Sequence, residues 1–324
     1  MNKKIRYILF ALLALGLSVA CTKGEHPVWQ PYDTPEEIVL SAAIGVETRA
    51  IVTNATDGLQ FNFARIDQNI DGSYPVDYSG SVALPVTRTY GNAGSAATEI
   101  VFTVGQYYLT RTTNNNTRLI GWYPRQPLTA GSITFDIDGD TDIMLSNELT
   151  GSKTDKFGTD TRVFTFSHLL TQIQVKAYAD DPDGCGKILS IALKDQETKC
   201  DVTLPVAPTA SAIAFSDRAA TPLPLVEKDI DGTAIDYSSG IVLPNTSANA
   251  VVCGYAMIAP RESSDLLTLI IETANEGMKE VTLPAVAMEA SVAYIVTLRF
   301  TSVGVTFTFN VTDWVDMDID CELY

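Results

Sequence analysis

The amino-acid sequence predicts an all-β protein made of antiparallel β-sandwiches. Apolar and polar residues alternate with a period of two in many short runs, and clusters of glycine, asparagine, aspartate and proline separate these runs. Each such run is typical of a strand with one buried and one solvated face. Convincing helical patterns are scarce, and a chain of 324 residues is long enough for two domains of ordinary size.

The first 20 residues have the pattern of an export signal rather than of a folded element. Basic residues precede an apolar run over residues 8–17, which is too short to span a bilayer comfortably. Small residues then lead to Cys21, and a cysteine at this place is typical of a bacterial lipoprotein that carries its lipid on that thiol. An ordinary secretory signal with a chance cysteine is the alternative. The polar, proline-containing residues 21–35 are expected to form a tether to the folded part.

Residues 36–50 predict a strand with a clean apolar face that ends at a basic residue. A trypsin-like protease could cut after Arg49, so that the mature chain would begin at Ala50. Losing this strand would leave an apolar trough and unpaired backbone groups, and each large buried side chain is worth about 1.5–3 kcal/mol. A strand from another subunit could fill the trough by β-augmentation, although a solvated Arg49 at an ordinary strand end is the simpler interpretation of the spacing. The apolar face of this removable strand consists of Ile38, Leu40, Ala42, Ile44 and Val46.

Further along the chain, alternating runs predict strands over residues 59–64 and 133–138, and again over residues 173–178 and 303–312. Between these pairs, residues 149–162 are polar and punctuated by glycine. They are therefore predicted to be a linker that contains the boundary between two domains.

Two segments of the second half leave alternatives open. Residues 263–275 begin like a capped helix, but their β-branched centre fits a strand equally well. The tail over residues 315–324 alternates, with aspartates on one face and apolar residues on the other. Such a strand suits donation into a neighbour's trough, and it fits the last strand of its own domain equally well. The apolar face of this candidate donor strand consists of Val315, Met317, Ile319 and Cys321.

The chain has five cysteines, and four remain for pairing if Cys21 carries lipid. An even number of cysteines in an exported chain is compatible with disulfides. Cys185 and Cys200 flank one apolar run, and a bridge between them would stabilise the fold by about 3 kcal/mol in the chain-entropy model. Cys253 and Cys321 would form the other pair, which would hold the tail in its own domain. Free buried thiols are the alternative for these residues.

Composition and motifs argue against an enzyme, a metalloprotein and a nucleic-acid-binding protein. The net charge of −17 repels phosphate backbones. The sequence contains no nucleophile elbow, P-loop, dinucleotide-binding fingerprint or zinc-protease motif. Of the two histidines, His168 lies among apolar residues and is expected to be a hydrogen-bonded structural residue. The acidic residues 136–142 lack the glycine and glutamate of a calcium-binding loop, so neither a metal nor a cofactor is expected.

Several short motifs follow one another along the chain in a specific order. They are the signal ending at Cys21, residues 47–50 (ETRA), 121–124 (GWYP), 142–144 (DIM), 166–173 (FSHLLTQI), 294–298 (YIVTL) and 313–314 (DW). In this order they resemble the fimbrillin family of Bacteroidetes, the subunits of lipoprotein-derived pili that include the major and minor fimbrillins. The resemblance covers essentially the whole chain.

The resemblance implies two tandem transthyretin-like antiparallel β-sandwich domains behind a removable N-terminal part. The expected division is a signal peptide over residues 1–20, a tether with the removable first strand over 21–49, a first sandwich over 50–158 and a second over 159–324. The resemblance also implies export as an outer-membrane lipoprotein, cleavage after Arg49 by a trypsin-like protease, and polymerisation by donated strands into a cell-surface fimbria.

The expected partners are therefore other fimbrial subunits, the outer membrane before processing, and a host or bacterial surface ligand. A tip adhesin or glycan-binding surface lipoprotein that does not elongate is the main alternative. Trp122 and Tyr123 would suit an aromatic sugar platform, but packing in the core beside Pro124 is the simpler interpretation of these rings. The sequence leaves open whether the subunit belongs to the stalk, the tip or the base.

Overall fold

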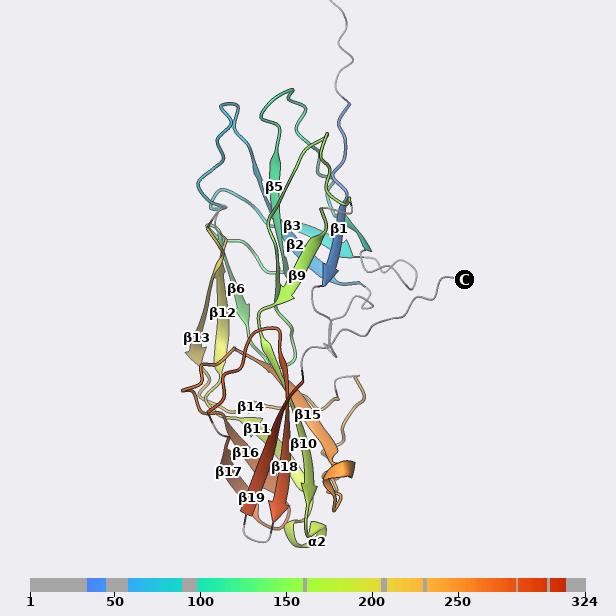
Figure 1. Cartoon of the computed structure of the whole chain (residues 1–324), viewed down its shortest axis with the longest axis vertical. Coiled ribbons are helices and arrows are strands. Elements are labelled where there is room, and N and C mark those ends of the chain that lie inside the picture. The colour runs from blue at the N-terminus through green and yellow to red at the C-terminus, as the bar shows by residue number, and fades with distance from the viewer. Residues whose placement is uncertain are drawn as a thin grey trace, which may run out of the picture. The chain divides into compact units, whose positions relative to one another are not determined.

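The computed structural model describes residues 34–44, 58–88, 98–159, 162–204, 209–229, 232–283, 285–301 and 304–312. Contacts divide the chain into a segment Met1–Pro35 and one unit Glu36–Tyr324, and every strand belongs to the second of these. Almost all regular elements of the described residues are strands, which confirms the prediction of an all-β fold (Figure 1). No helix among these residues is long and apolar enough to cross a bilayer.

The first half of the unit forms a ring of strands. In chain order its strands are β1 (Leu40–Ile44), β2 (Gln60–Asp67), β3 (Leu84–Arg88), β4 (Thr98–Phe102), β5 (Thr117–Tyr123), β6 (Ser132–Asp136), β7 (Met144–Ser146), β8 (Leu149–Gly151) and β9 (Phe164–His168). The hydrogen-bonded order is β2-β3-β4-β1-β9-β7-β5, and a further pairing of β2 with β5 closes the circuit. β8 joins β5 beside β7, and β6 lies outside the ring. Each strand of the ring is therefore hydrogen-bonded on both sides.

Aromatic side chains fill the inside of this ring. Alternation along β2 puts Phe61 and Phe63 on its inner face, where they are buried with Phe164 and Phe166 of β9. The rings of Phe63 and Phe164 pack edge to face with their centroids 4.9 Å apart. Gly121 on β5 allows this packing, because a Cβ atom there would meet the Phe63 ring at 2.6 Å.

The second half forms two four-stranded sheets that share one apolar core. Its elements are β10 (Thr171–Ala179), α2 (Pro182–Cys185), β11 (Ile188–Leu193), β12 (Glu197–Thr203), β13 (Ala212–Arg218), β14 (Leu223–Pro224), the 3-10 helix η1 (Ser247–Asn249), β15 (Val251–Ile258), β16 (Thr268–Thr273), β17 (Gly277–Thr282), β18 (Ala293–Thr301) and β19 (Gly304–Thr312). One sheet has the order β15-β10-β18-β19 and the other β14-β11-β16-β17. Val175 and Leu298 come from the first of these sheets and Leu269 from the second, and all three are buried between them.

A third sheet joins the two halves. β6 of the first half pairs with β12, which in turn pairs with β13 of the second half. The core beside this sheet takes residues from both halves, including Trp122, Ile133 and Tyr255. β9 follows the predicted boundary at residue 158, yet it pairs with β1 and β7 in the ring. Strands thus pair across the predicted boundary, and the division into two transthyretin-like domains stays a prediction.

The predicted alternating strands are present as β2, β6, β10 and β19. The open alternative at residues 263–275 is decided in favour of a strand, because β16 occupies its centre. The predicted linker over residues 149–162 is wrong. This segment contains β8, and Phe157 is buried between Tyr108 and Phe164, with ring centroids 6.0 Å and 5.8 Å apart. A short strand and one buried ring fix the segment although most of its residues are polar.

Candidate functional site

β1 lies between β4 and β9 in the ring and is hydrogen-bonded to both. It runs antiparallel to β4, with Leu40 opposite Ile100, and parallel to β9, with Ala42 beside Phe164. Three residue pairs connect it to each neighbour. Taking β1 out would leave an empty place flanked by unpaired edges of β4 and β9, and we call this place the slot.

Side chains along residues 38–42 alternate between the core of the ring and solvent. Ile38, Leu40 and Ala42 are 2%, 0% and 3% exposed and belong to the aromatic core. Val39 between them is 44% exposed. Burial of the two larger side chains contributes about 1.5–3 kcal/mol each. An empty slot would lose this contribution and expose the aromatic core to water.

A second set of contacts holds the chain just before β1. The amide of Ile38 donates to the carbonyl oxygen of Gln106 at 2.7 Å. The amide of Tyr108 donates to the carbonyl oxygen of Glu36 at 3.0 Å. We call residues 104–108 the clasp loop, because they extend the backbone pairing of this strand from β1 back to Glu36.

Residues 155–158 cover the same stretch of chain from another side. Lys156 forms an ion pair with Glu36. Gly158 has a φ angle of +76°, and a Cβ atom at this position would lie 3.1 Å from the carbonyl oxygen of Val39. Glycine suits both the backbone angle and the close approach. The start of the removable strand is therefore enclosed by two loops as well as by its ladder.

Tyr108 connects these two loops. Its hydroxyl oxygen accepts a hydrogen bond from the amide of Phe157 at 2.8 Å, and the two rings stack. Burial raises the pKa of the Tyr108 hydroxyl, so this group keeps its proton at neutral pH. The clasp loop and residues 155–158 are thus one packed assembly around the chain before β1.

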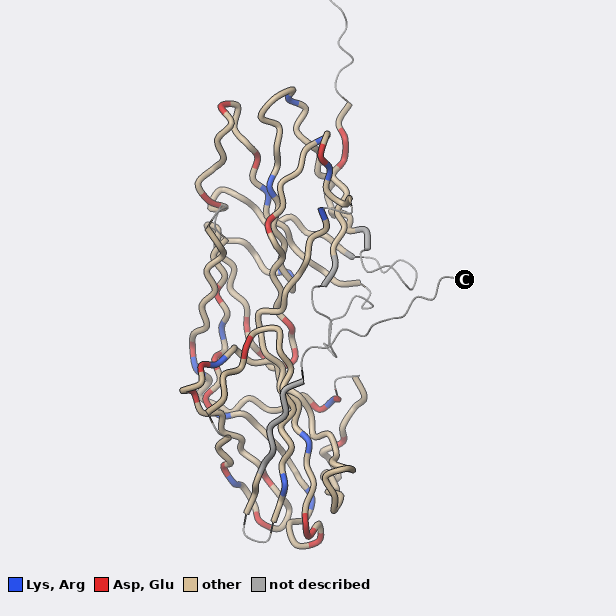
Figure 2. The backbone as a smooth tube through the Cα atoms, viewed as in Figure 1, with Lys and Arg blue, Asp and Glu red and all other residues tan. Residues whose placement is uncertain are grey.

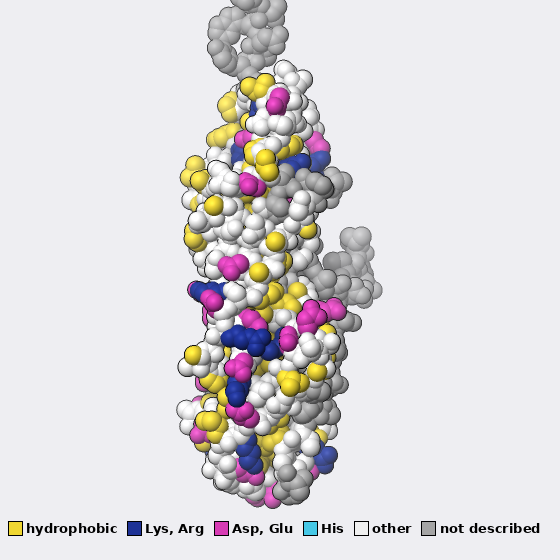
Figure 3. Space-filling model, turned by 90° about the vertical axis from the view of Figure 1, so that its left-hand side faces the viewer, with side chains coloured by type: hydrophobic (Ala, Val, Ile, Leu, Met, Phe, Trp, Pro, Cys, Tyr) yellow, Lys and Arg dark blue, Asp and Glu magenta, His cyan; other side chains and the backbone are white. Residues whose placement is uncertain are grey.

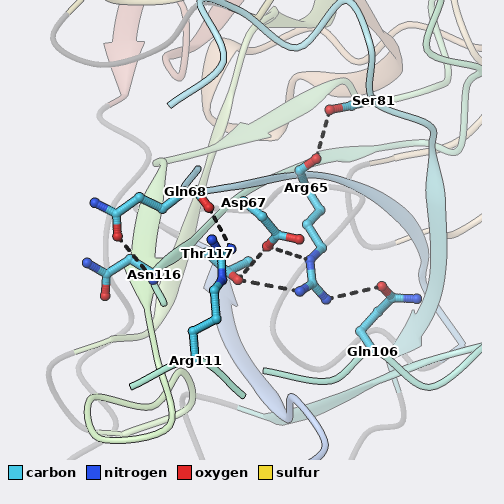
Figure 4. A network of polar contacts seen from close by, with 8 residues as sticks. All are labelled: Arg65, Asp67, Gln68, Ser81, Gln106, Arg111, Asn116 and Thr117. Atoms are coloured by element: carbon cyan, nitrogen blue, oxygen red, sulfur yellow. Dashed lines mark hydrogen bonds and ion pairs between the residues drawn. The ribbon is translucent and has the colours of Figure 1, made fainter. Parts of the chain in front are cut away.

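A polar network anchors the clasp loop to the ring (Figure 4). On β2, Arg65 pairs through Nε with Asp67 Oδ1 at 3.0 Å and donates from Nη1 to Gln106 Oε1 at 3.4 Å. On β5, the Thr117 hydroxyl donates to Asp67 at 2.6 Å and accepts from Arg65 Nη2 at 3.5 Å. Ser81 Oγ donates to the carbonyl oxygen of Arg65 at 2.8 Å. These bonds fix the position of Gln106 and so of its backbone carbonyl oxygen. That oxygen accepts a hydrogen bond from a backbone amide, a contact that does not depend on the side chains of the bound strand.

Several residues of the predicted site lie outside the described residues. They are Cys21, Val46, Arg49, Ala50 and the tail with Val315, Met317, Ile319 and Cys321. Ile44 lies in β1, where it pairs with Phe166 of β9. Lipid attachment, cleavage and donation by the tail therefore stay predictions.

The cysteines of the described residues are free thiols. Cys185, Cys200 and Cys253 are buried and unbridged, so the structure contains free thiols in place of the predicted Cys185–Cys200 bridge. The physical reason is that Cys185 belongs to the core of the second half, whereas Cys200 belongs to the core shared by both halves. Burial raises the pKa of Cys200 and of Cys253 to about 12. Cys321 lies outside the described residues, and Cys253, its predicted disulfide partner, is a free thiol.

His168 forms a buried pair with an acidic residue. Its Nδ1 lies 2.5 Å from Asp142 Oδ2, and the two side chains are 1% and 0% exposed. His168 ends β9 and is paired with Met144 of β7, while Asp142 precedes β7 in the chain. The pair thus connects two neighbouring strands of the ring, in agreement with the structural role expected of this histidine.

The other groups considered in the sequence have structural roles. The carboxylate of Asp138 accepts from the amides of Asp140 and Thr141 at 3.0 Å and 2.7 Å, so the acidic run forms a turn. No three His, Cys, Asp or Glu side chains gather as a metal site within the described ranges. Trp122 is fully buried and packs in the core. Acidic and basic positions are scattered over both halves of the described chain (Figure 2).

Sequence reasoning missed the clasp loop and its anchor. Residues 104–108 show no alternation, and they hold Glu36 and Ile38 through backbone atoms, which leave no signal in residue types. Arg65 has the position of a solvated residue in the alternation of its strand. Only the structure shows that its side chain is 15% exposed and directed at Gln106.

The model of a family described as fimbrillin-like matches residues 48–314. No curated protein matches the chain. A solved structure of a candidate cell adhesion protein from Bacteroides uniformis ATCC 8492 has a TM-score of 0.57 and 18% identity, over 86% of this chain and 99% of that chain. Another, from Bacteroides ovatus ATCC 8483, has a TM-score of 0.54 and 14% identity, over 88% of this chain and 99% of that chain.

These results differ in what they establish. At such low identity, the two solved structures show a shared fold alone. The family model, in contrast, spans most of the chain, from residue 48 to residue 314, and includes every described strand except β1. It confirms the resemblance that the sequence motifs indicate. The chain belongs to the fimbrillin-like family.

Proposed function

We propose that the chain is a structural subunit of a bacterial surface fimbria that is completed by strand exchange. It is exported as a lipoprotein on Cys21 and cut after Arg49, and it polymerises when a donated strand replaces β1. One observation carries this proposal: β1 is an internal strand of the ring, yet it precedes Arg49 in the chain. Family membership supports a structural role rather than an enzymatic one.

A single cut after Arg49 would separate β1 from every other described strand. The two short ladders and the clasp loop would then hold β1 without a covalent link. Short ladders make exchange feasible, whereas the apolar core behind β1 makes an empty slot unfavourable by several kcal/mol, at about 1.5–3 kcal/mol for each large side chain. These opposing demands favour replacement of β1 over its simple loss, which is the physical basis of β-augmentation.

The proposal also covers the division into domains, the donor of the strand, the partners and the location of the mature subunit. The two halves, with β9 in the first of them, would be two tandem transthyretin-like sandwiches in place of the predicted division at residue 158, and the donated strand would be the tail of another subunit. The partners are other fimbrial subunits, a trypsin-like protease, the outer membrane through the lipid before processing, and a host or bacterial surface ligand. The mature subunit is located in a cell-surface fimbria.

Replacing Arg49 by alanine tests the proposal. The Arg49→Ala chain should fold and reach the surface, but it should form no polymer that resists mild denaturation. N-terminal sequencing should detect no chain that begins at Ala50. Arg218→Ala is a suitable control, because Arg218 is an exposed residue of β13 that pairs with Glu197, and this variant should polymerise normally. Normal polymers of the Arg49→Ala chain would contradict cleavage at this position.

A further inference from the structure

β19 is the outer strand of its sheet, beside β18 (Figure 1). The two strands pair over nine consecutive residue pairs, from Gly304 opposite Thr301 to Thr312 opposite Ala293, and no bulge interrupts this ladder. No second strand pairs with β19 within the described residues. A regular edge strand of this length offers a row of backbone donors and acceptors to another chain.

The hydrogen bonds of β18 show which residues of β19 face this open edge. The amide of Asp180, just after β10, donates to the carbonyl oxygen of Phe300 in β18 at 2.8 Å. Backbone groups of successive strand residues point to opposite sides, so even-numbered residues of β18 point to β10 and odd-numbered ones to β19. The β19 residues opposite the odd-numbered ones point back to β18. The backbone groups that face the open edge therefore belong to Val305, Phe307, Phe309 and Val311.

The edge at β19 lacks the charge that the other outer strands of the second half carry. The sequence of β19, GVTFTFNVT, contains no charged residue and no proline. In contrast, β17 contains Lys279 and Glu280, and β13 contains Asp217 and Arg218. Charge and proline are the means by which edge strands avoid pairing with another chain. Of these three edges, the one at β19 is therefore the best suited to pairing.

The sequence of β19 is also nearly the same in both directions from Thr308. Phenylalanine stands next to Thr308 on each side, and valine stands three positions away on each side. Between them lie two polar residues, Thr306 and Asn310. Two such strands, antiparallel and centred on Thr308, would set phenylalanine opposite phenylalanine and threonine opposite threonine. Cross-strand pairs of aromatic residues and of threonines stabilise a sheet, and no like charges would meet.

We propose that the open edge of β19 pairs with β19 of a second copy of this chain, antiparallel and centred on Thr308. In this register Val305 lies opposite Val311 of the second copy. Phe307 lies opposite Phe309 of the second copy. These are the residues whose backbone groups face the open edge, so the donors and acceptors of both strands meet. The inference is independent of the proposed strand exchange, because the slot takes no part in it.

Other registers satisfy fewer of these groups. A shift by one residue would set groups that face the open edge opposite groups that point back to β18. A shift by two residues keeps the direction of the groups, but it sets either Val305 or Val311 opposite a residue beyond the ends of β19. The register centred on Thr308 is thus the one in which all four edge residues find a partner in the facing strand.

The proposed contact is isologous, because both copies use the same strand. A two-fold axis passes between the two Thr308 residues, so the contact closes at two copies. The sheet β15-β10-β18-β19 of one copy continues into that of the other, and β19 becomes an internal strand in both. The pair therefore removes the open edge of this sheet from solvent.

The experiments use the uncleaved Arg49→Ala chain, so that pairing is measured apart from strand exchange. A cysteine at the two-fold axis tests the register. The added changes Cys21→Ser and Cys321→Ser leave the buried native thiols as the background. In this background Thr308→Cys should form a disulfide between two copies, because directly opposite residues have Cα atoms about 4.5–5.5 Å apart. Diamide oxidises the two thiols and accepts the two electrons and two protons that they release.

Thr306→Cys is the matched control for this cross-link. In the proposed register its two copies lie four positions apart, about 13 Å along the strand, which is too far for a disulfide. A non-reducing gel should therefore show a covalent dimer for Thr308→Cys and a monomer for Thr306→Cys. Absence of the dimer from the Thr308→Cys chain, or equal cross-linking of both chains, would overturn the inference.

Opposite charges at the axis test the pairing without a cross-link. Thr308→Lys and Thr308→Asp each set like charges opposite one another, and each should lower the dimer fraction in sedimentation by about tenfold or more. An equal mixture of the two should form dimers again, which a folding defect would prevent. Thr165→Lys, which adds the same charge to an exposed residue of β9, should pair like the parent chain. A parent chain that stays monomeric up to about 1 mM, or a mixture that stays monomeric, would contradict the proposed pair.

Discussion

The two halves of the molecule differ in whether their outer strands are paired on both sides. In the first half, seven strands close a ring in which each strand is hydrogen-bonded on both sides. In the second half, β13, β17 and β19 each have one neighbouring strand within the described residues. The ring is complete only with β1, which lies before Arg49, whereas the second half takes no described strand from that part of the chain. The ring, whose strands are all paired on both sides, is thus the part that depends on β1.

Charge protects edge strands of the second half. Lys279 on β17 pairs with Glu276, and Arg218 on β13 pairs with Glu197 of β12. On the face that Figure 3 shows, which is the left-hand side of Figure 1, basic and acidic side chains of the second half lie next to one another. Charged side chains on edge strands oppose pairing with another chain. Charge thus shields the edges at β13 and β17 of the second half, whereas under the proposed strand exchange the ring of the first half would be refilled.

Removal of β1 should have the largest effect, and the effect should be confined to the ring. A cleaved chain without residues 34–49 loses the burial of Ile38 and Leu40, at a cost of about 3–6 kcal/mol. Hydrogen exchange at the amides of β4 and β9 should accelerate by about 100-fold or more. Amides of β10 and β18 serve as the internal control and should keep their rates. Equal acceleration in both halves would contradict the comparison.

Shortening one buried side chain of β1 should have the next largest effect. In the uncleaved chain, Leu40→Ala should lower the free energy of unfolding of the first half by about 2–5 kcal/mol. Val39→Ala changes the neighbouring exposed side chain and should cost about 0.5 kcal/mol or less. Urea unfolding followed by hydrogen exchange measures both. Equal costs for the two variants would mean that β1 does not pack on the aromatic core.

Loss of the anchor of the clasp loop should have a smaller effect. Arg65→Met removes the bonds to Asp67 and Gln106, which should lower the free energy of unfolding of the first half by about 1–3 kcal/mol. It should also speed the release of β1 from the cleaved chain, measured with a fluorophore on the released segment. Arg299→Met removes an exposed ion pair with Asp180 in the second half and serves as the control, because solvent screens such a pair and its loss should leave both measurements unchanged. Release at an unchanged rate from the Arg65→Met chain would show that the clasp loop does not retain β1.

The cysteines should give the smallest effect. A reductant should leave the unfolding midpoint unchanged, because the described cysteines are free thiols. Burial raises the pKa of Cys200 and Cys253 to about 12 from 9.0, so both thiols should react slowly with a thiol reagent at pH 8. The unfolded chain loses these protons above pH 9.0 while the folded chain keeps them, so this part of the stability is complete below pH 9.0 and falls as the pH rises toward 12. Rapid labelling of the native chain would contradict the burial of these thiols.

Local patterns predicted the strands because a strand repeats its environment every second residue. Phe61 and Phe63 are both apolar since both face the aromatic core. The same reasoning failed at residues 149–162, where one ring, Phe157, fixes a polar segment. It also failed for the proposed bridge of Cys185 and Cys200, since closeness in the sequence does not show that two side chains belong to different cores.

The sequence by itself determined the all-β class and the buried face of the strand that carries Ile38, Leu40 and Ala42. The tertiary structure alone decided that β1 is an internal strand between β4 and β9, and that the clasp loop and Arg65 enclose its start. The physical reason is the nature of the two kinds of contact. Burial selects residue types and therefore appears in the sequence, whereas backbone hydrogen bonds between strands form with almost any residue and leave the choice of neighbours to the fold.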